Sequence, residues 1–457
     1  MSMLFRSWRL ALVCAGLLTA SMDAGDWPRF RGPNGSGICE DDESFPTTWS
    51  PGDNVKWSTD LPGAGVSCPI VIGDAVFVTC YSGYGLDRRN PGDQDDLKRH
   101  LVRLDRDSGS IIWTTTIDAV LPEDPYAGAG VPEHGYASHT PVSDGERVYV
   151  FFGKTGALAF DFDGNEVWRT GLGTESDPRR WGSASSPILH NDLLIVTASA
   201  ESEAIVALDT SSGDEVWRAE ANGLSNLWGT PILVPVDDER TDLVVGVPYE
   251  FWALNPETGK LRWFCEVMPT DQYNSSVVFG DGVIYGIEGR GGGSVAVRAG
   301  GEDDVTGSHV VWSGRDSSRF VTPLLHEGLL YYFSGNTAAC LEASSGDRVY
   351  QKRLTAGEEP TADDENQGRR RGRRSFRGMG GQNYASPILA DGKIYYTTRA
   401  GHVHVIAAGR EFEELAVNRV SDAAGEDFSA TPAASEGQLF LRSNKAVYCV
   451  QEADTNR

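Results

Sequence analysis

The sequence repeats a unit of about 45 residues, and this period constrains the fold more than any other feature. Residues 185–217 show the unit most clearly. A Ser-Pro pair is followed by two apolar segments around an Asn-Asp turn, a third apolar segment, a Ser-Gly turn and a last segment that ends in Trp217. Short apolar segments separated by turn residues are typical of β-strands. Each unit is therefore expected to form a small antiparallel sheet of four strands.

A Ser-Pro or Thr-Pro pair, or a variant of it, marks the start of each unit. Most starts are 44 to 46 residues apart, and two wider steps of 72 and 64 residues indicate insertions. The second residue of the pair is Pro69, Pro141, Pro187, Pro231, Val277, Pro323, Pro387 or Pro432.

The two ends of the sequence indicate how the repeats close. The last unit, which begins at Ser429, contains only three predicted strands, and residues 54–57 have the sequence of an isolated fourth strand. Pairing this N-terminal strand with the C-terminal unit closes a ring of sheets and removes its free edges. We therefore predict an all-β fold, an eight-bladed β-propeller of four-stranded antiparallel blades over residues 54–457. The tryptophans that end the outer strands are expected to pack between neighbouring blades.

The N-terminus has the pattern of an export signal. Arg6 and Arg9 precede an apolar run over residues 10–20, which is followed by small residues. The run is shorter than the roughly 20 apolar residues that a membrane helix needs. We predict a signal peptide over residues 1–25, with a retained anchor as the alternative, and an irregular lead-in over residues 26–53. The predicted location is the periplasm or cell envelope, with no transmembrane span after cleavage.

Charge and cysteine content exclude some functions. The formal net charge is −25, which argues against nucleic acid as a partner because phosphate backbones are bound by basic surfaces. No cysteines form a C-x-x-C pair, so the sequence predicts no metal site. Cys68 and Cys80 flank a predicted hairpin turn, and they are expected either to form a disulfide, which suits an exported protein, or to remain buried free thiols.

The pattern A-L-D-x-x-S-G-x-x-x-W at residues 207–217, with a related copy at residues 253–263, resembles the tryptophan-docking repeat of PQQ-like (quinoprotein-like) propellers. That family includes alcohol dehydrogenases that use pyrroloquinoline quinone (PQQ) and BamB-like assembly scaffolds. The lead-in DWPRFRGPNGSG resembles exported members from planctomycete-type bacteria. The resemblance implies the propeller fold for nearly the whole chain. Because the chain lacks the adjacent cysteine pair of the dehydrogenases, no cofactor is predicted, and PQQ with calcium is the alternative.

The functional face is expected at the mouth of the central channel, where the residues just before the inner strands converge. An aromatic residue precedes seven of the eight inner strands, and aromatic walls suit a planar or sugar-like ligand. The alternative is that these rings only plug the channel. No catalytic residue is predicted, and the candidate ligand-binding residues are His134, Tyr136, His139, Arg180, Trp181, Trp228, Tyr273, Arg319, Phe320, Tyr384 and Phe428.

Three insertions are expected to reach the same mouth, at residues 81–100, 118–135 and 356–382. The third contains an acidic run followed by six arginines among glycines. We predict a disordered loop over residues 357–382, with an anion-binding lid as the alternative.

Together these features predict an exported, monomeric binding or scaffolding module of the cell envelope. Its expected partner at the mouth is an envelope protein, a saccharide or a small planar ligand. The alternative function is an enzyme at the same mouth, either a PQQ-dependent dehydrogenase or a carbohydrate-active enzyme. Carboxylates converging with an Asn there would favour the enzyme, whereas a filled channel with an exposed strand edge would favour a protein partner.

Overall fold

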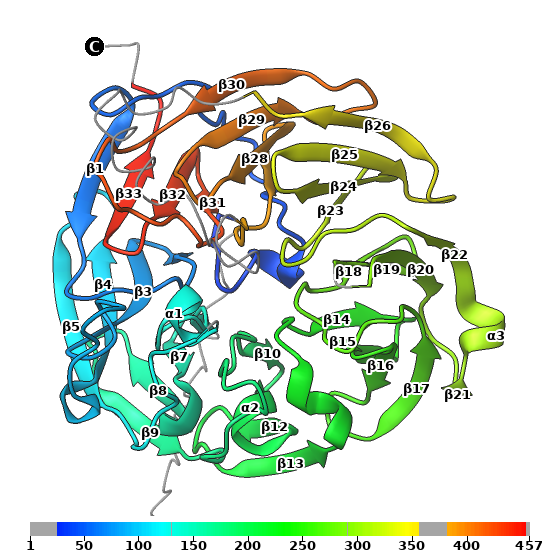
Figure 1. The fold of residues 1–457 in the computed structure, drawn as a ribbon, viewed down its shortest axis with the longest axis horizontal. Helices are drawn as coiled ribbons and strands as arrows, with labels where there is room; N and C mark the ends of the chain where they lie inside the picture. The colour runs from blue at the N-terminus through cyan, green and yellow to red at the C-terminus, as the bar shows by residue number, and fades with distance from the viewer. Residues whose placement is uncertain (1–24, 129, 290, 356–381, 454–457) are drawn as a thin grey trace, which may run out of the picture.

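The computed structural model describes residues 25–128, 130–289, 291–355 and 382–453. They form a ring of eight sheets around a central channel (Figure 1), so the predicted propeller is confirmed. Nearly all of the predicted signal peptide and of the predicted disordered loop lies outside the described residues. Within the described residues, none of the helices has the length and apolarity of a membrane-crossing segment.

In the first four blades the strands follow the chain from the channel outwards. They are β2 (Ile70–Ile72), β3 (Ala75–Ser82), β4 (Lys98–Asp105) and β5 (Ile111–Asp118) in blade 1; β6 (Val142–Ser143), β7 (Arg147–Phe151), β8 (Ala157–Asp161) and β9 (Glu166–Thr170) in blade 2; β10 (Ile188–His190), β11 (Leu193–Ala198), β12 (Ala204–Asp209) and β13 (Glu215–Glu220) in blade 3; and β14 (Ile232–Pro235), β15 (Thr241–Val247), β16 (Glu250–Leu254) and β17 (Leu261–Glu266) in blade 4, which gains the short edge strand β21 (Asp303–Asp304).

The remaining blades follow the same order, except that the outer strand of blade 8 comes from the N-terminus. The strands are β18 (Val278–Gly280), β19 (Val283–Glu288), β20 (Gly293–Arg298) and β22 (Val310–Gly314) in blade 5; β23 (Leu324–His326), β24 (Leu329–Ser334), β25 (Thr337–Glu342) and β26 (Arg348–Arg353) in blade 6; β27 (Ile388–Ala390), β28 (Lys393–Thr397), β29 (Val403–Ala407) and β30 (Glu414–Asn418) in blade 7; and β31 (Ala433–Ser435), β32 (Gln438–Arg442), β33 (Ala446–Val450) and β1 (Val55–Asp60) in blade 8.

The predicted closure is confirmed, because β1 pairs antiparallel with β33 and places Trp57 opposite Cys449. The helices are short and lie in the connections. They are α1 (Val131–His134), α2 (Ser199–Ser202) and α3 (Thr306–His309), with the 3-10 turns η1 (Pro33–Gly35), η2 (Gln94–Asp96), η3 (Gly153–Thr155) and η4 (Asn222–Asn226).

Outer-strand tryptophans contact the next blade, as predicted, and a turn glycine of that blade makes room for the indole ring. Trp217 at the outer edge of blade 3 donates its indole N–H to the carbonyl of Pro256 in blade 4, with an Nε1–O distance of 2.9 Å. Gly259 in the same turn has φ of +68°, and a Cβ atom there would lie 2.4 Å from the indole. Glycine is therefore required both by the backbone and by the close approach of the ring. The equivalent indole bonds, at 2.8 to 2.9 Å, join Trp57 to Arg106, Trp113 to Phe162, Trp168 to Thr210 and Trp312 to Ala343.

The irregular lead-in occupies the central channel (Figure 1). Trp27 is buried and forms a β-bridge with Val71 of the innermost strand of blade 1, and Ile38 forms another with Leu389 of blade 7. Gly73, in the turn after β2, donates its N–H to the side chain of Asp26. The lead-in therefore enters from the end of the channel where the inner hairpins turn, and it fills the axis on that side.

The six described cysteines are all free and buried. Cys68 and Cys80 therefore form no disulfide, and the free-thiol alternative is the one that the structure adopts. Burial in apolar surroundings raises the pKa of Cys80 to about 11, so this thiol stays protonated at neutral pH.

Candidate ligand-binding site

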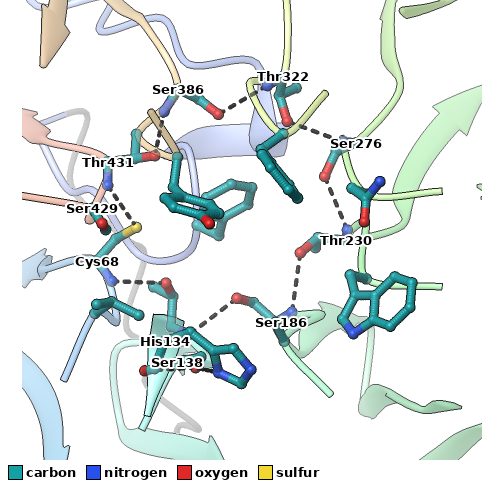
Figure 2. Close-up of a pocket in the computed structure, with 18 of the residues that line it drawn as sticks. Cys68, His134, Ser138, Ser186, Thr230, Ser276, Thr322, Ser386, Ser429 and Thr431 are labelled. Atoms are coloured by element: carbon teal, nitrogen blue, oxygen red, sulfur yellow. Dashed lines mark hydrogen bonds between the residues drawn. The ribbon is translucent and has the colours of Figure 1, made fainter. Parts of the chain in front are cut away.

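A closed ring of hydrogen bonds surrounds the channel at the start of the inner strands (Figure 2). Each blade contributes the residue two positions before its innermost strand. The backbone N–H of that residue donates to the side chain of its counterpart in the next blade, at N–O distances of 2.9 to 3.1 Å. Thr431 closes the circuit by donating to Sγ of Cys68 at 3.2 Å. We call this set the hydroxyl ring, and its members are Cys68, Thr140, Ser186, Thr230, Ser276, Thr322, Ser386 and Thr431.

The seven hydroxyls of the ring act as hydrogen-bond acceptors within it. Each oxygen accepts a backbone N–H, and none of the seven donates to an oxygen or nitrogen atom of the described residues. All seven residues are at most 6% exposed. A hydroxyl carries one donor in addition to its acceptor lone pairs. The side chains of Thr140 and Thr431 lie within hydrogen-bonding reach of the Cys68 thiol. The other five hydroxyls therefore line the enclosed space with O–H donors that have no acceptor among the described residues.

That space is a cavity of about 180 Å³, the mouth cavity, which all eight ring residues line. Two aromatic pairs form much of its wall. Trp181 and Trp228, from the connections into blades 3 and 4, lie with ring centroids 5.3 Å apart. Phe320 and Tyr384, from the connections into blades 6 and 7, lie 4.7 Å apart. Phe30 of the lead-in also lines the cavity.

His134 at the end of α1 is held in one orientation at the edge of the mouth cavity. Its Nε2 lies 2.6 Å from the carbonyl oxygen of Trp181, and its Nδ1 lies 2.6 Å from Oγ of Ser138. A carbonyl only accepts, so these partners assign the proton to Nε2 and leave Nδ1 as the acceptor of the serine hydroxyl. Burial lowers the pKa of His134, which keeps the imidazole neutral at pH 7.

Charged groups stand around the cavity. Glu133 of α1 is the one carboxylate among the described residues that line it, and it forms ion pairs with Arg399 at 2.8 Å and Arg88 at 3.6 Å. Arg399 also pairs with Asp427 at 2.6 Å and lies over the ring of Tyr384. Because Arg88 belongs to the insertion at residues 81–100 and Glu133 to that at residues 118–135, both insertions reach the mouth as predicted.

A second, smaller cavity of about 30 Å³ lies beside the first, and His134 and Ser138 line both. Its wall contains the buried residues His139, Ser183 and Glu201. Ser183 donates to Glu201 at 2.6 Å and lies 3.1 Å from Nε2 of His139. Burial raises the pKa of Glu201 to about 7 and lowers that of His139 to about 3. A space of this size and polarity has room for one or two water molecules.

A family model described as "Outer membrane protein assembly factor BamB" matches residues 97–352, more than half of the chain. The chain belongs to the BamB family. The PQQ-like resemblance of its repeats is thereby confirmed, and the propeller just described is a BamB-family propeller.

Relatives of two kinds resemble this BamB-family propeller. The polyvinylalcohol dehydrogenase of Pseudomonas sp is 23% identical over a 271-residue alignment, and the match covers 48% of this chain and 37% of that protein. The match thus spans little more than a third of that curated relative's length. The crystal structure of BamB from Moraxella catarrhalis superposes with a TM-score of 0.57 at 13% identity, covering 88% of this chain and 98% of that one. A europium-containing methanol dehydrogenase superposes with a TM-score of 0.60 at 12% identity, covering 92% and 89%. At these identities the two structures show the shared fold alone.

The structure brings five of the eleven predicted ligand-binding residues to the wall of the mouth cavity. They are His134, Trp181, Trp228, Phe320 and Tyr384.

The other six do not line the mouth cavity. Tyr136 and His139 face the smaller cavity, where Tyr136 donates to the carbonyl of Asp124 at 2.7 Å. Tyr273 packs against Phe251 between blades, and Phe428 packs against Tyr448. Arg319 lies over the ring of Phe320, 5.0 Å from its centroid, and Arg180 is exposed with φ of +54°.

Sequence reasoning missed the hydroxyl ring, Phe30 and Asn274. The Ser-Pro and Thr-Pro pairs that define the repeat were the available signal for the ring, since a Ser or Thr occurs at the same place in every blade except blade 1, which has Cys68. Asn274 lines the mouth cavity beside the ring, and its amide N–H₂ donates to the buried carboxylate of Glu288 at 3.0 Å. The amide oxygen of Asn274 is thereby left as an acceptor. No pattern in the sequence pointed to Phe30 as a cavity residue.

Proposed function

We propose that this BamB-family propeller is an exported binding module of the cell envelope, and that it takes a small planar or sugar-like ligand in the mouth cavity. The proposal of a ligand is supported by the open cavity of about 180 Å³ between two aromatic pairs. The alternative was that the aromatic rings only plug the channel. Export is supported by the N-terminal pattern, and an envelope location also by the family description. An envelope protein as partner, and the monomeric state, stay predictions.

The aromatic pairs would supply most of the affinity. Aromatic rings bind planar and sugar-like molecules through their faces, and each such contact contributes about 0.5–1.5 kcal/mol beyond the area that it buries. The rings are held before a ligand arrives. Trp228 donates its indole N–H to the carbonyl of Gly182 at 2.7 Å, and the guanidinium of Arg319 covers Phe320. Little side-chain ordering is then left for binding, which favours affinity.

Isothermal titration of the full chain tests this proposal. The probes are 2-naphthoate as a planar ligand and glucuronate as a sugar-like one. The variant Phe320→Leu, which removes one ring of the cavity wall, is expected to weaken binding of the accepted probe at least tenfold. The matched control is Phe412→Leu, which changes a half-buried ring packed against Tyr350 away from the cavity. Equal losses in the two variants, or no binding of either probe, would contradict the proposal.

A PQQ-dependent dehydrogenase is the second candidate, and the match to the polyvinylalcohol dehydrogenase favours it. The wall of the mouth cavity contains one carboxylate and one Asn, Glu133 and Asn274, which favours the enzyme, but it offers a metal ion few further ligands. Among the described residues, no group of three or more His, Cys, Asp or Glu side chains is placed to hold a metal. Glu133, which lines the mouth cavity, is already paired with two arginines. Titration with PQQ in the presence and absence of Ca²⁺ separates the candidates, because micromolar binding that requires calcium would support the dehydrogenase and contradict the binding module.

A further inference from the structure

We infer that the ligand of the mouth cavity carries an oxyanion, such as a carboxylate or phosphate group, and that this group is bound by the donors of the hydroxyl ring above a set of buried arginines. The inference rests on the proposed function and names the chemical class of the ligand. Two independent features carry it, the direction of the ring hydrogen bonds and the placement of buried positive charge.

The hydroxyl ring provides donors without acceptors. All seven O–H groups are buried and line the cavity, and five of them, all but those of Thr140 and Thr431 near the Cys68 thiol, donate to no atom of the described residues. A buried donor that lacks an acceptor costs about 1–3 kcal/mol. An ionised carboxylate or phosphate only accepts hydrogen bonds, and its oxygens have several lone pairs to offer. A neutral amide or alcohol of the same shape satisfies fewer of these donors.

Three buried arginines lie directly behind the ring. Arg31 is 1% exposed and donates to the carbonyls of Pro323 at 2.8 Å and Pro387 at 3.0 Å. Arg442, also 1% exposed, donates to the carbonyl of Ser67 at 2.6 Å. Arg29 donates to the carbonyl of Pro231 at 3.5 Å. Each of these carbonyls belongs to a residue next to a member of the hydroxyl ring.

These three guanidiniums have no counter-charge among the described residues. Their hydrogen bonds go to neutral groups, mostly backbone carbonyls, and none of the three takes part in an ion pair. Burial lowers the pKa of Arg31 to about 9 and that of Arg442 to about 10, so both stay charged at pH 7. A buried charge without a partner is unfavourable. An anion seated on the hydroxyl ring would offset part of this cost.

The rim of the mouth cavity carries guanidinium groups as well as carboxylates. The guanidiniums of Arg319 and Arg399 cover Phe320 and Tyr384, and Arg399 also pairs with Glu133 and Asp427. These pairs balance charge at the rim, so the positive charge that would attract an anion is that of the three buried arginines.

The test compares acids with neutral molecules of the same shape. Isothermal titration of the full chain would use 2-naphthoate against 2-naphthamide, and glucuronate against glucose. The acid is expected to bind at least tenfold more tightly than its neutral counterpart. Replacing Thr230→Val and Thr322→Val together removes two ring donors without a large change in shape, and it is expected to lower this ratio at least fivefold. The matched control, Thr230→Ser with Thr322→Ser, retains both hydroxyls and is expected to retain the ratio.

The outcomes separate this inference from the proposed function. If both members of a pair bind equally, or the neutral one binds more tightly, the oxyanion inference is wrong and the ligand-binding module stands. If neither pair binds, both proposals fail. A merely structural role for the ring would lower stability in the valine variant while leaving the ratio unchanged, and that result would also overturn the inference.

Discussion

The backbone N–H of Thr431 in blade 8 donates to Sγ of Cys68 in blade 1 at 3.2 Å. This contact closes the hydroxyl ring at the place where the last blade meets the first. The other seven links of the ring use a serine or threonine oxygen, so the closing link alone depends on a thiol. Sulfur is a weaker acceptor than a hydroxyl oxygen, and the closing link is therefore the weakest in the ring.

Substitutions at Cys68 test the importance of this closing link. Cys68→Ser restores the hydroxyl found in every other blade and is expected to leave the free energy of unfolding unchanged or to raise it slightly. Cys68→Ala leaves the buried N–H of Thr431 without an acceptor and is expected to lower it by about 1–3 kcal/mol. Urea unfolding of both variants measures the difference, and an alanine variant as stable as the serine variant would contradict the role assigned to the link.

Alanine substitutions at two glycines distinguish the cost of a left-handed backbone from the cost of crowding a tryptophan. Gly259 and Gly328 both have positive φ, but only Gly259 packs against an indole, that of Trp217. Gly328→Ala is expected to cost about 1–2 kcal/mol from the left-handed backbone alone. Gly259→Ala should cost about 1–3 kcal/mol more, because the added methyl group overpacks the blade interface. Thermal unfolding of the two variants is the measurement, and equal losses would show that the indole contact contributes little.

Glu201 should make stability depend on pH. Burial raises the pKa of its carboxyl to about 7, near His139, Ser183, Glu123 and Arg99, whereas the unfolded chain has the ordinary value of 4.5. Between these values the folded state binds the extra proton, so the contribution of Glu201 is complete below about pH 4.5 and is lost as the pH rises to 7. The full change is at most about 3 kcal/mol.

The comparison of wild type with Glu201→Gln isolates this effect, because the opposite contribution of His139, whose pKa is lowered, is present in both proteins. The free energy of unfolding of the wild type, relative to the variant, should fall between pH 4.5 and pH 7 and stay level above that. Urea unfolding at several pH values provides the data. A constant difference over this range would show that Glu201 is ionised in the folded protein throughout.

The propeller was predictable because each blade repeats the residues that make its contacts. The Ser-Pro and Thr-Pro starts, the turn glycines and the terminal tryptophans each have a local role that a single sequence displays. The fourth strand of blade 8 was predictable for the same reason, since Trp57 lies in a copy of the outer-strand motif without the strands that usually precede it.

The site was less predictable because two residues that are adjacent in the sequence can point in different directions, one into the cavity and the other away from it. Tyr273 packs between blades against Phe251, whereas its neighbour Asn274 lines the mouth cavity. In the same way Arg180 is exposed and Trp181 lines the cavity. An aromatic residue before an inner strand therefore predicts the mouth region but not the cavity wall. The lead-in has no period, so its position in the channel, with Phe30 in the cavity, could not be inferred from the pattern.

The most direct test of the central claim is a crystal structure of the full chain with 6-bromo-2-naphthoate, because the anomalous signal of bromine locates the ligand independently of the protein density. The account predicts one bound molecule in the mouth cavity. Its rings should contact Phe320 and Tyr384 or Trp181 and Trp228, and its carboxylate should lie within hydrogen-bond distance of the hydroxyl ring. Bromine located only outside the mouth cavity, or an empty cavity at saturating ligand, would contradict the claim that this cavity is the binding site.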